Sequence, residues 1–162
     1  MQRRKLDRID RAILRNLQED GRMTNVELAR RVDISAPPCL RRVRTLEAEG
    51  YLHGYHAAVD GAKLGFTEMF FALVGLSSQA QNVLQSFEQS VSQWDEVREC
   101  HMIRGGGDFL LKLVARDKAH RDALTMRLTA SEGVVTVTTL ETIRTEKDVP
   151  GVPVEEDEAV PA

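Results

Sequence analysis

Residues 68–76 constrain the fold most, because the strand that they predict carries apolar side chains on both faces. Alternate positions of a strand point to opposite sides of its sheet. One side would carry Met69, Phe71 and Leu73, and the other would carry Phe70, Ala72, Val74 and Leu76. An antiparallel sheet with one wet face would instead alternate apolar and polar residues. Both faces of this sheet therefore need cover.

The sequence after this strand predicts two helices and three further strands in the order βαββαβ. The helices are expected over residues 79–92 and after Asp117, where apolar positions repeat with helical spacing. The strands are expected at 94–103, 109–115 and 134–144, the first two joined by a hairpin. This order is typical of a ferredoxin-like α+β fold. Its two helices cover one face only, so we expect a second copy of the chain to cover the other.

The 162 residues carry a net charge of −3, and this charge is divided unevenly along the chain. Residues 1–50 hold 12 lysine and arginine residues against 8 acidic ones, a balance of +4, and the remaining residues carry −7. A basic N-terminal segment followed by an acidic remainder indicates that only residues 1–50 bind a polyanion.

Residues 1–50 predict three short helices. Asp7, Thr24 and Ser35 stand at the expected N-caps, and Pro37 and Pro38 fall in the first turn of the third helix, where missing backbone donors cost little. Two short helices joined by a tight turn, the second rich in arginine, form a helix-turn-helix pattern. The alternative is a solvated helix face that is merely rich in arginine.

The candidate DNA contacts come from the second and third of these helices. They are Arg30, Arg31, Ser35, Pro37, Pro38, Arg41, Arg42 and Arg44. We expect Arg41 and Arg42 to make the strongest contacts, because a guanidinium grips a phosphate or the edge of a guanine with two donors. Ser35 and the two prolines would approach the DNA backbone or base edges, and the other arginines would hold phosphate.

An ordered series of segments runs through the chain: LDRIDRAIL at 6–14, DGR at 20–22, NVELA at 25–29, RVRTLEAEG at 42–50, YLHGYHAAVD at 51–60 and LGF at 64–66. In this series, and onward to about residue 147, the chain resembles the Lrp/AsnC family of leucine- and asparagine-responsive transcription regulators. The resemblance implies a winged helix-turn-helix domain at 1–50, a crossing strand and linker at 51–66, and a ferredoxin-like dimerisation and effector domain at 67–147. It also implies dimers packed sheet to sheet, often gathered into tetramers or octamers. Arg42 matches a recurrent arginine of the family, which implies that it also serves domain structure.

The loop from Arg104 to Asp108 is the candidate effector site. A phosphate-binding loop is disfavoured, because this loop enters a strand instead of a helix and lacks a Lys-Ser/Thr pair, while a plain tight turn remains an alternative. The family resemblance implies that the loop matches a Gly-Asp-aromatic-Asp motif whose backbone and acid contact an amino-acid effector. Gly105 and Asp108 match its ends, whereas Gly106 and Gly107 replace the first acid and the aromatic residue.

Other chemistry finds less support in the sequence. His53, His56, Cys100 and His101 lack metal-ligand spacing, so we expect neither a metal nor a cofactor. Cys39 is expected to be a small buried hydrophobe, and two cysteines favour a reducing cytoplasm. No apolar run is long enough to span a membrane, and the N-terminus does not read as a secretory signal. The acidic, proline-containing tail at 148–162 is expected to be disordered.

The sequence thus predicts a sequence-specific DNA-binding transcription regulator that is modulated by an amino acid or a similar small effector and is not an enzyme. Its dimer would place two recognition helices on a roughly palindromic target. Two alternatives remain open. Sirohaem decarboxylases resemble the same two-domain plan, although they need a tetrapyrrole pocket with histidine and arginine. An architectural protein would instead wrap DNA with little sequence preference.

Overall fold

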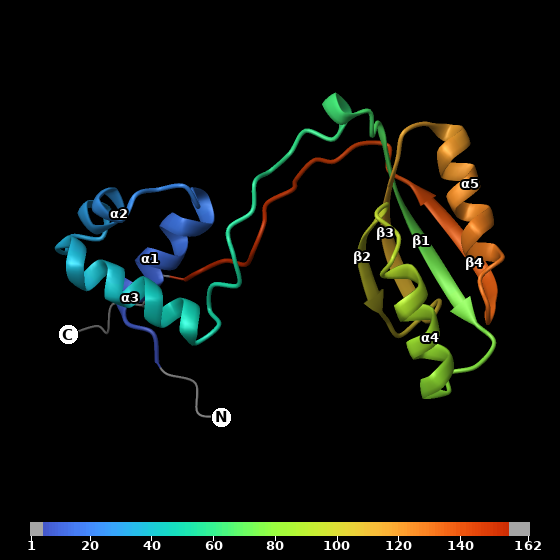
Figure 1. Ribbon diagram of the computed structural model, residues 1–162, viewed down its shortest axis with the longest axis horizontal. Coiled ribbons are helices and arrows are strands. Elements are labelled where there is room, and N and C mark those ends of the chain that lie inside the picture. Colours follow the sequence, from blue (N-terminus) through green and yellow to red (C-terminus); the bar gives the residue numbers. More distant parts are fainter. Residues whose placement is uncertain (1–4, 156–162) are drawn as a thin grey trace. The chain divides into compact units, whose positions relative to one another are not determined.

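The computed structural model describes residues 5–155, so expectations for residues 1–4 and 156–162 lie outside it. The chain divides into two compact units. The first joins the residues up to 58 with those from 147 onward, and the second spans residues 59–146. Figure 1 shows the first unit as a cluster of helices and the second as a sheet with two helices.

Three helices build the first unit. They are α1 (Arg8–Glu19), α2 (Asn25–Arg31) and α3 (Ala36–Ala48). Two of the expected caps are confirmed, because the Asp7 carboxylate accepts a hydrogen bond from the Asp10 amide at 2.8 Å and the Thr24 hydroxyl accepts one from the Glu27 amide at 3.2 Å. Ser35 stands at the N-cap of α3, but its side chain makes no capping hydrogen bond.

The apolar faces of these helices meet in one core. Its buried members are Ile13, Leu14, Leu17, Leu28, Ala29, Val32, Cys39 and Leu46. Cys39 is fully buried, as expected for a small hydrophobe. Because Leu28 and Ala29 of α2 share this core with Cys39 and Leu46 of α3, burial of apolar surface fixes the angle between the two helices.

The crossing strand expected within residues 51–66 has no strand partner within the single chain and stays a prediction. Residues 52–60 have neither helical nor strand structure, and the linker contains only a short 3-10 helix, η1 (Ala62–Leu64). A strand needs a hydrogen-bonded neighbour, and the described strands of this chain pair only with one another. The sequence alone therefore makes this segment extended without making it a strand.

The second unit has the predicted βαββαβ order. Its elements are β1 (Glu68–Leu76), α4 (Gln81–Val91), β2 (Val97–Met102), β3 (Phe109–Ala115), α5 (Lys118–Thr129) and β4 (Val134–Glu141). The four strands form one antiparallel sheet in the order β2-β3-β1-β4 (Figure 1). The Asp117 carboxylate caps α5 by accepting a hydrogen bond from the His120 amide at 2.7 Å.

One face of the sheet is covered and the other is open. Both helices pack on the covered face, where Phe87 and Val91 of α4 and Leu124 and Leu128 of α5 join the buried core of the sheet. The even-numbered positions of β1 belong to this core, as the sequence pattern predicts. The odd-numbered positions are only half-buried, because the two helices cover the opposite face of the sheet.

The register identifies the rest of the open face. Positions paired with the odd-numbered residues of β1 lie on the same side of the sheet. They are Leu110, Lys112 and Val114 from β3, and Thr136, Thr138 and Leu140 from β4. The open face is therefore apolar at its centre, around Phe71 and Leu73, and mixed at its margins.

The start of the C-terminal tail contacts the first unit at two of its described residues. Val154 is half-buried against the core of the first unit, and the Gln18 side chain of α1 donates a hydrogen bond to the Val152 carbonyl at 2.9 Å. The disorder expected for residues 148–162 stays a prediction, since Val154 alone among the described residues from 148 to 155 is not exposed.

Within residues 5–155, no helix is long and apolar enough to cross a membrane. The same residues contain no cluster of histidine, cysteine and acidic side chains suited to a metal ion. Both cysteines are free.

Candidate nucleic-acid interface and effector loop

The turn between α2 and α3 is held by polar contacts as well as by the core. The Ile34 amide donates to the Ala29 carbonyl at 3.0 Å, and the Asn25 side chain donates to the Ala36 carbonyl at 2.8 Å. Asp33 adopts a left-handed conformation with φ 56°, which aspartate tolerates better than most residues. These contacts fix the start of α3 relative to α2, as a helix-turn-helix requires.

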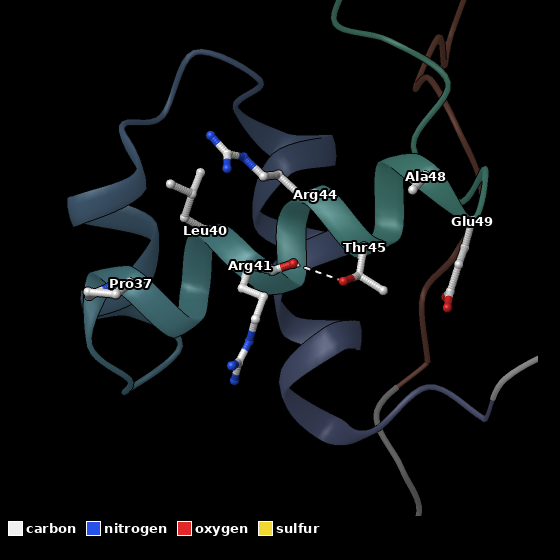
Figure 2. Close-up of a pocket in the computed structure, with 7 residues that line it drawn as sticks. All are labelled: Pro37, Leu40, Arg41, Arg44, Thr45, Ala48 and Glu49. Carbon is white, nitrogen blue, oxygen red and sulfur yellow. Dashed lines mark hydrogen bonds between the residues drawn. The ribbon is translucent and has the colours of Figure 1, made fainter.

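The outward face of α3 forms a shallow groove of about 480 Å³ (Figure 2). The groove is lined by Pro37, Leu40, Arg41, Arg44, Thr45, Ala48 and Glu49. These positions repeat every three or four residues, so they share one side of the helix. The Thr45 hydroxyl donates to the Arg41 carbonyl at 2.9 Å, which turns this side chain back onto the helix.

Arg41 and Arg44 are the cationic groups at this groove. Figure 2 shows their side chains leaving α3 in different directions, with Leu40 beside them. Both are exposed, and neither forms an ion pair with any residue from 5 to 155. Their guanidinium groups are therefore available to a phosphate or a base edge.

The two arginines of α2 differ from each other. Arg30 is exposed and has no ion pair among the described residues. Arg31 forms an i, i+4 ion pair with Glu27 at 2.9 Å, with both side chains about 40% exposed. An exposed pair of this kind contributes little to stability, so Arg31 would exchange Glu27 for a phosphate at small cost.

The Arg42 side chain bonds to two carboxylates at the start of α1. Its Nη1 atom donates to Asp7 Oδ2 at 2.8 Å and to Asp10 Oδ1 at 2.7 Å, and it thereby joins α3 to the start of α1. Asp10 is only 1% exposed. A buried carboxylate needs such a partner, because removing it from water without one is costly. The structure therefore supports the structural role that the family resemblance implies for Arg42, while its DNA contact stays a prediction.

The ionisation of this cluster follows from the same contacts. The hydrogen bonds to Asp10 and Asp7 raise the pKa of Arg42. Burial by itself would raise the pKa of Asp7, but the Asp10 amide and the Arg42 guanidinium outweigh it and lower that pKa overall. Both partners are thus held in their charged forms.

The remaining predicted contacts lie at the start of α3. Ser35 is exposed, and its hydroxyl is not used as a cap, so it is free to donate outward. Pro37 is exposed at the end of the groove, whereas Pro38 is half-buried. Sequence reasoning missed Leu40 and Thr45, which line the groove; the helical spacing from Pro37 would have placed both on this face.

The candidate effector loop is tied to the end of β1 through Asp108. One carboxylate oxygen accepts from the Leu76 amide at 2.7 Å and the other accepts from the Gln79 side chain at 3.0 Å. The Asp108 amide in turn donates to the Val74 carbonyl at 2.8 Å. Asp108 therefore holds the hairpin against β1, and sequence reasoning missed its partner Gln79.

The glycines of this loop lie close to the open sheet face. A Cβ atom at Gly107 would stand 3.0 Å from both Leu73 Cγ and the Val74 carbonyl, so the backbone approaches β1 more closely than a side chain allows. Gly105 has a φ of +137°, and a Cβ atom there would meet nothing within 4 Å, which leaves its amide region open. The glycines thus allow the backbone of the loop to pack directly against Leu73.

The loop lies at the edge of a charged cluster on β2 and β3. Glu99 pairs with Lys112 at 2.9 Å and with His101 at 3.1 Å. The hydrogen bonds from Lys112 and then from His101 lower the pKa of Glu99. In the register, Lys112 lies opposite Phe71, so this cluster borders the apolar centre of the open face.

A helix-turn-helix with free arginines on its second helix, followed by an α+β domain, defines a DNA-binding regulator of transcription. Family models match both parts: a winged helix-turn-helix DNA-binding model covers residues 6–53, and an Lrp/AsnC ligand-binding domain model covers residues 69–152. The chain belongs to the Lrp/AsnC family.

Named relatives agree with this assignment. The chain is 51% identical over 144 residues to a leucine-responsive regulatory protein of Rhizobium meliloti, covering 88% of this chain and 92% of that one. It is 42% identical over 130 residues to the leucine-responsive regulatory protein of Escherichia coli K12, covering 80% and 79%. These relatives are named as regulators and not as enzymes.

Solved structures share the fold. A transcriptional regulator from Neisseria meningitidis, crystallised as a complex with L-methionine, superimposes with a TM-score of 0.87 at 32% identity, covering 92% of this chain and 97% of that one. An AsnC-family regulator from Agrobacterium tumefaciens gives a TM-score of 0.86 at 32% identity, covering 91% and 97%. Both units of the chain therefore take part in the likeness.

Proposed function

We propose that this regulator binds a roughly palindromic duplex site as a homodimer or a larger assembly and that an amino acid modulates it. The observation that carries the DNA half is the groove on α3, whose two arginines form no ion pair with any residue from 5 to 155. Arg41 reads bases or phosphate, Arg44 and Arg30 hold phosphate, and Ser35 and Pro37 approach the backbone. Arg31 joins them when it leaves Glu27, while Arg42 supports the helix from behind.

The uncovered face of the sheet supports the assembly. Phe71 and Leu73 lie at its centre, and Leu110, Val114 and Leu140 surround them. Apolar surface of this kind is stabilised when a second sheet covers it. A second copy of the chain offers the same face, and pairing the two gives the closed symmetry that most soluble oligomers have. The dimer would present two α3 helices to two half-sites.

The effector half rests on the ligand-binding domain model and on the loop at 104–108. Exposed glycine amides suit a carboxylate, and Asp108 suits an ammonium group. The solved relative with bound L-methionine makes an amino acid the leading candidate. Because Gly106 and Gly107 replace an acid and an aromatic residue of the family motif, the loop offers an effector fewer side-chain contacts than that motif does. The effector would act by stabilising one assembly state over another.

Replacing Arg41 with alanine should weaken binding to the specific site. If Arg41 reads a base, the loss should be about 1–3 kcal/mol and confined to the specific site. If it holds a phosphate, specific and random duplexes should weaken alike. A gel-shift titration with both duplexes at one stated salt concentration measures the two losses.

The matched control is Arg98→Ala, which removes the same charge from an exposed position on β2. It should leave both affinities unchanged. Wild-type affinity for the specific site in the Arg41 variant would remove Arg41 from the interface. Equal wild-type affinity for specific and random duplexes would favour the architectural alternative.

Replacing Asp108 separates its structural role from its role toward an effector. Asp108→Ala removes two hydrogen bonds from the hairpin and should destabilise the second unit by about 1–3 kcal/mol. Asp108→Asn keeps an acceptor for the Leu76 amide but removes the charge. It should lose affinity for an amino acid, measured by calorimetry, with a smaller loss of stability. Unchanged amino-acid affinity in the asparagine variant would exclude an ammonium contact at this carboxylate.

The decarboxylase alternative has no observation in its favour. Its chemistry needs histidine and arginine around a tetrapyrrole, whereas His101 is paired with Glu99 and His120 accepts from the Arg116 amide. We propose a regulator that acts on chromosomal DNA in the cytoplasm, without a catalytic step.

A further inference from the structure

The C-terminal tail is part of the first unit, although it follows the last strand of the second unit in sequence. Three contacts seat it there. Val154 is half-buried against the core that α1, α2 and α3 share. The Gln18 side chain of α1 donates to the Val152 carbonyl. Gly151, with φ +80°, lies so close to Gln18 that a Cβ atom would stand 2.7 Å from its carboxamide carbon.

The tail also complements the unit in charge. Residues 1–58 carry 12 basic and 8 acidic residues, a balance of +4. Residues 147–162 carry one lysine and five acidic residues, a balance of −4, and four of the acids follow Val154 directly at 155–158. Charges held within about one Debye length, roughly 8–10 Å at physiological salt, act on one another. A tail anchored at Val154 therefore cancels the net charge of the unit that carries α3.

We propose that the tail is a built-in ligand of the DNA-binding unit, anchored on α1 by Val154 and Gln18, whose acidic residues weaken binding to duplex DNA. None of the described tail residues, which end at 155, lines the groove on α3, so the proposed effect is electrostatic. Random duplex is bound through charge alone, so the tail should lower affinity for random duplex more than affinity for a specific site. The tail thereby increases the ratio of specific to non-specific affinity. The effect of the tail on DNA binding rests on the proposed DNA contacts, whereas the anchoring of the tail does not.

The anchoring is tested with two valines that differ in burial. Val154→Ser removes the buried anchor, and Val152→Ser changes a side chain that is 67% exposed. Hydrogen exchange of the full chain should rise around Gln18 and over residues 150–155 in the Val154 variant and stay at the wild-type level in the Val152 variant. Wild-type exchange in the Val154 variant would overturn the docking, whether or not the protein binds DNA.

The electrostatic effect is tested by charge reversal. Glu155→Lys/Glu156→Lys should tighten binding to random duplex about fivefold at low salt, and the gain should vanish at high salt because the charges are then screened. Asp95→Lys/Glu132→Lys makes the same change in net charge at exposed positions of the second unit. Fluorescence anisotropy with a labelled duplex measures all variants.

Three further outcomes decide the interpretation. An equal gain from both reversed pairs would overturn the proposal, because net charge alone would then explain the effect. Adding Val154→Ser to the tail reversal should reduce its gain, because the charges are no longer held at the unit. If the wild type does not bind random duplex at low salt, the proposed DNA contacts on α3 are wrong. Hydrogen exchange then still shows whether the tail docks on the first unit.

Discussion

Replacing Arg42 with methionine should unfold the first unit at a temperature where the second stays folded. The substitution keeps most of the aliphatic packing but leaves Asp10, 1% exposed, without its guanidinium partner. Removing one member of a buried ion pair costs about 3–5 kcal/mol, and we expect the lower end of this range because Arg42 is itself 29% exposed. DNA binding should disappear with the fold.

The pH dependence of this loss distinguishes a lost ion pair from lost packing. The pKa of Asp7 is lowered in the folded state, so its contribution to stability is complete above its unfolded pKa and is lost as the pH falls through the folded pKa. The difference in stability between wild type and variant should therefore shrink in acid. A difference that does not change with pH would contradict the ion-pair explanation.

The chain offers internal reporters and a control for this experiment. Its single tryptophan, Trp94, lies in the second unit, and both tyrosines, Tyr51 and Tyr55, lie in the first. Tyrosine emission and helical circular dichroism should change early, while tryptophan emission stays native. Arg44→Met is the matched control, because Arg44 is exposed on the same helix without an ion pair to any described residue. It should leave the stability of the first unit nearly unchanged.

Placing a carboxylate at Phe71 should convert the assembly into monomers. Phe71 lies at the centre of the open face, between Lys112 on β3 and Leu140 on β4. Lys112 already pairs with Glu99, and burying an additional carboxylate beside it costs several kcal/mol, so Phe71→Asp should weaken self-association by at least about a hundredfold. Sedimentation measures the assembly, and a gel shift should show a parallel loss on a palindromic site, since one recognition helix reaches only one half-site.

Two variants keep this prediction testable if Phe71→Asp fails to fold. Leu140→Asp lies on the same face but is 50% exposed in the single chain, so it should break the assembly at a smaller cost in folding. Met126→Asp lies on α5, which packs on the covered face, and its side chain is 72% exposed. It should leave the assembly intact. A dimer that survives both aspartates on the open face would overturn the sheet-to-sheet arrangement.

Local sequence patterns predict most of the elements because each pattern reports a short-range cause. Capping side chains at Asp7, Thr24 and Asp117 mark helix starts through bonds to amides three residues away. The alternation along β1 predicts its covered and open faces, because a strand has a period of two. Arg41 and Arg44 are predicted as DNA contacts, and helical spacing puts both on the outward face.

The parts that sequence reasoning missed depend on partners that lie far along the chain. Arg42 looks like its neighbours in the sequence, but it reaches Asp7 and Asp10, 35 and 32 residues earlier. Asp108 is held by Leu76 and Gln79, about 30 residues away. The strand expected within residues 51–66 stays a prediction, because strand structure requires a hydrogen-bonded neighbour and the single chain offers residues 52–60 none.

The sequence by itself determined the order of the elements, the cationic character of α3 and the need for cover on both faces of the sheet. Hydrophobic periodicity, helix capping and local charge depend on residues that lie close together in the chain, so they can be predicted without a tertiary structure. Only the tertiary structure decided which arginine is internal, which carboxylate holds the hairpin and where the tail docks. Gln18 and Val152, which share a hydrogen bond, lie 134 residues apart, and their meeting depends on how the chain packs.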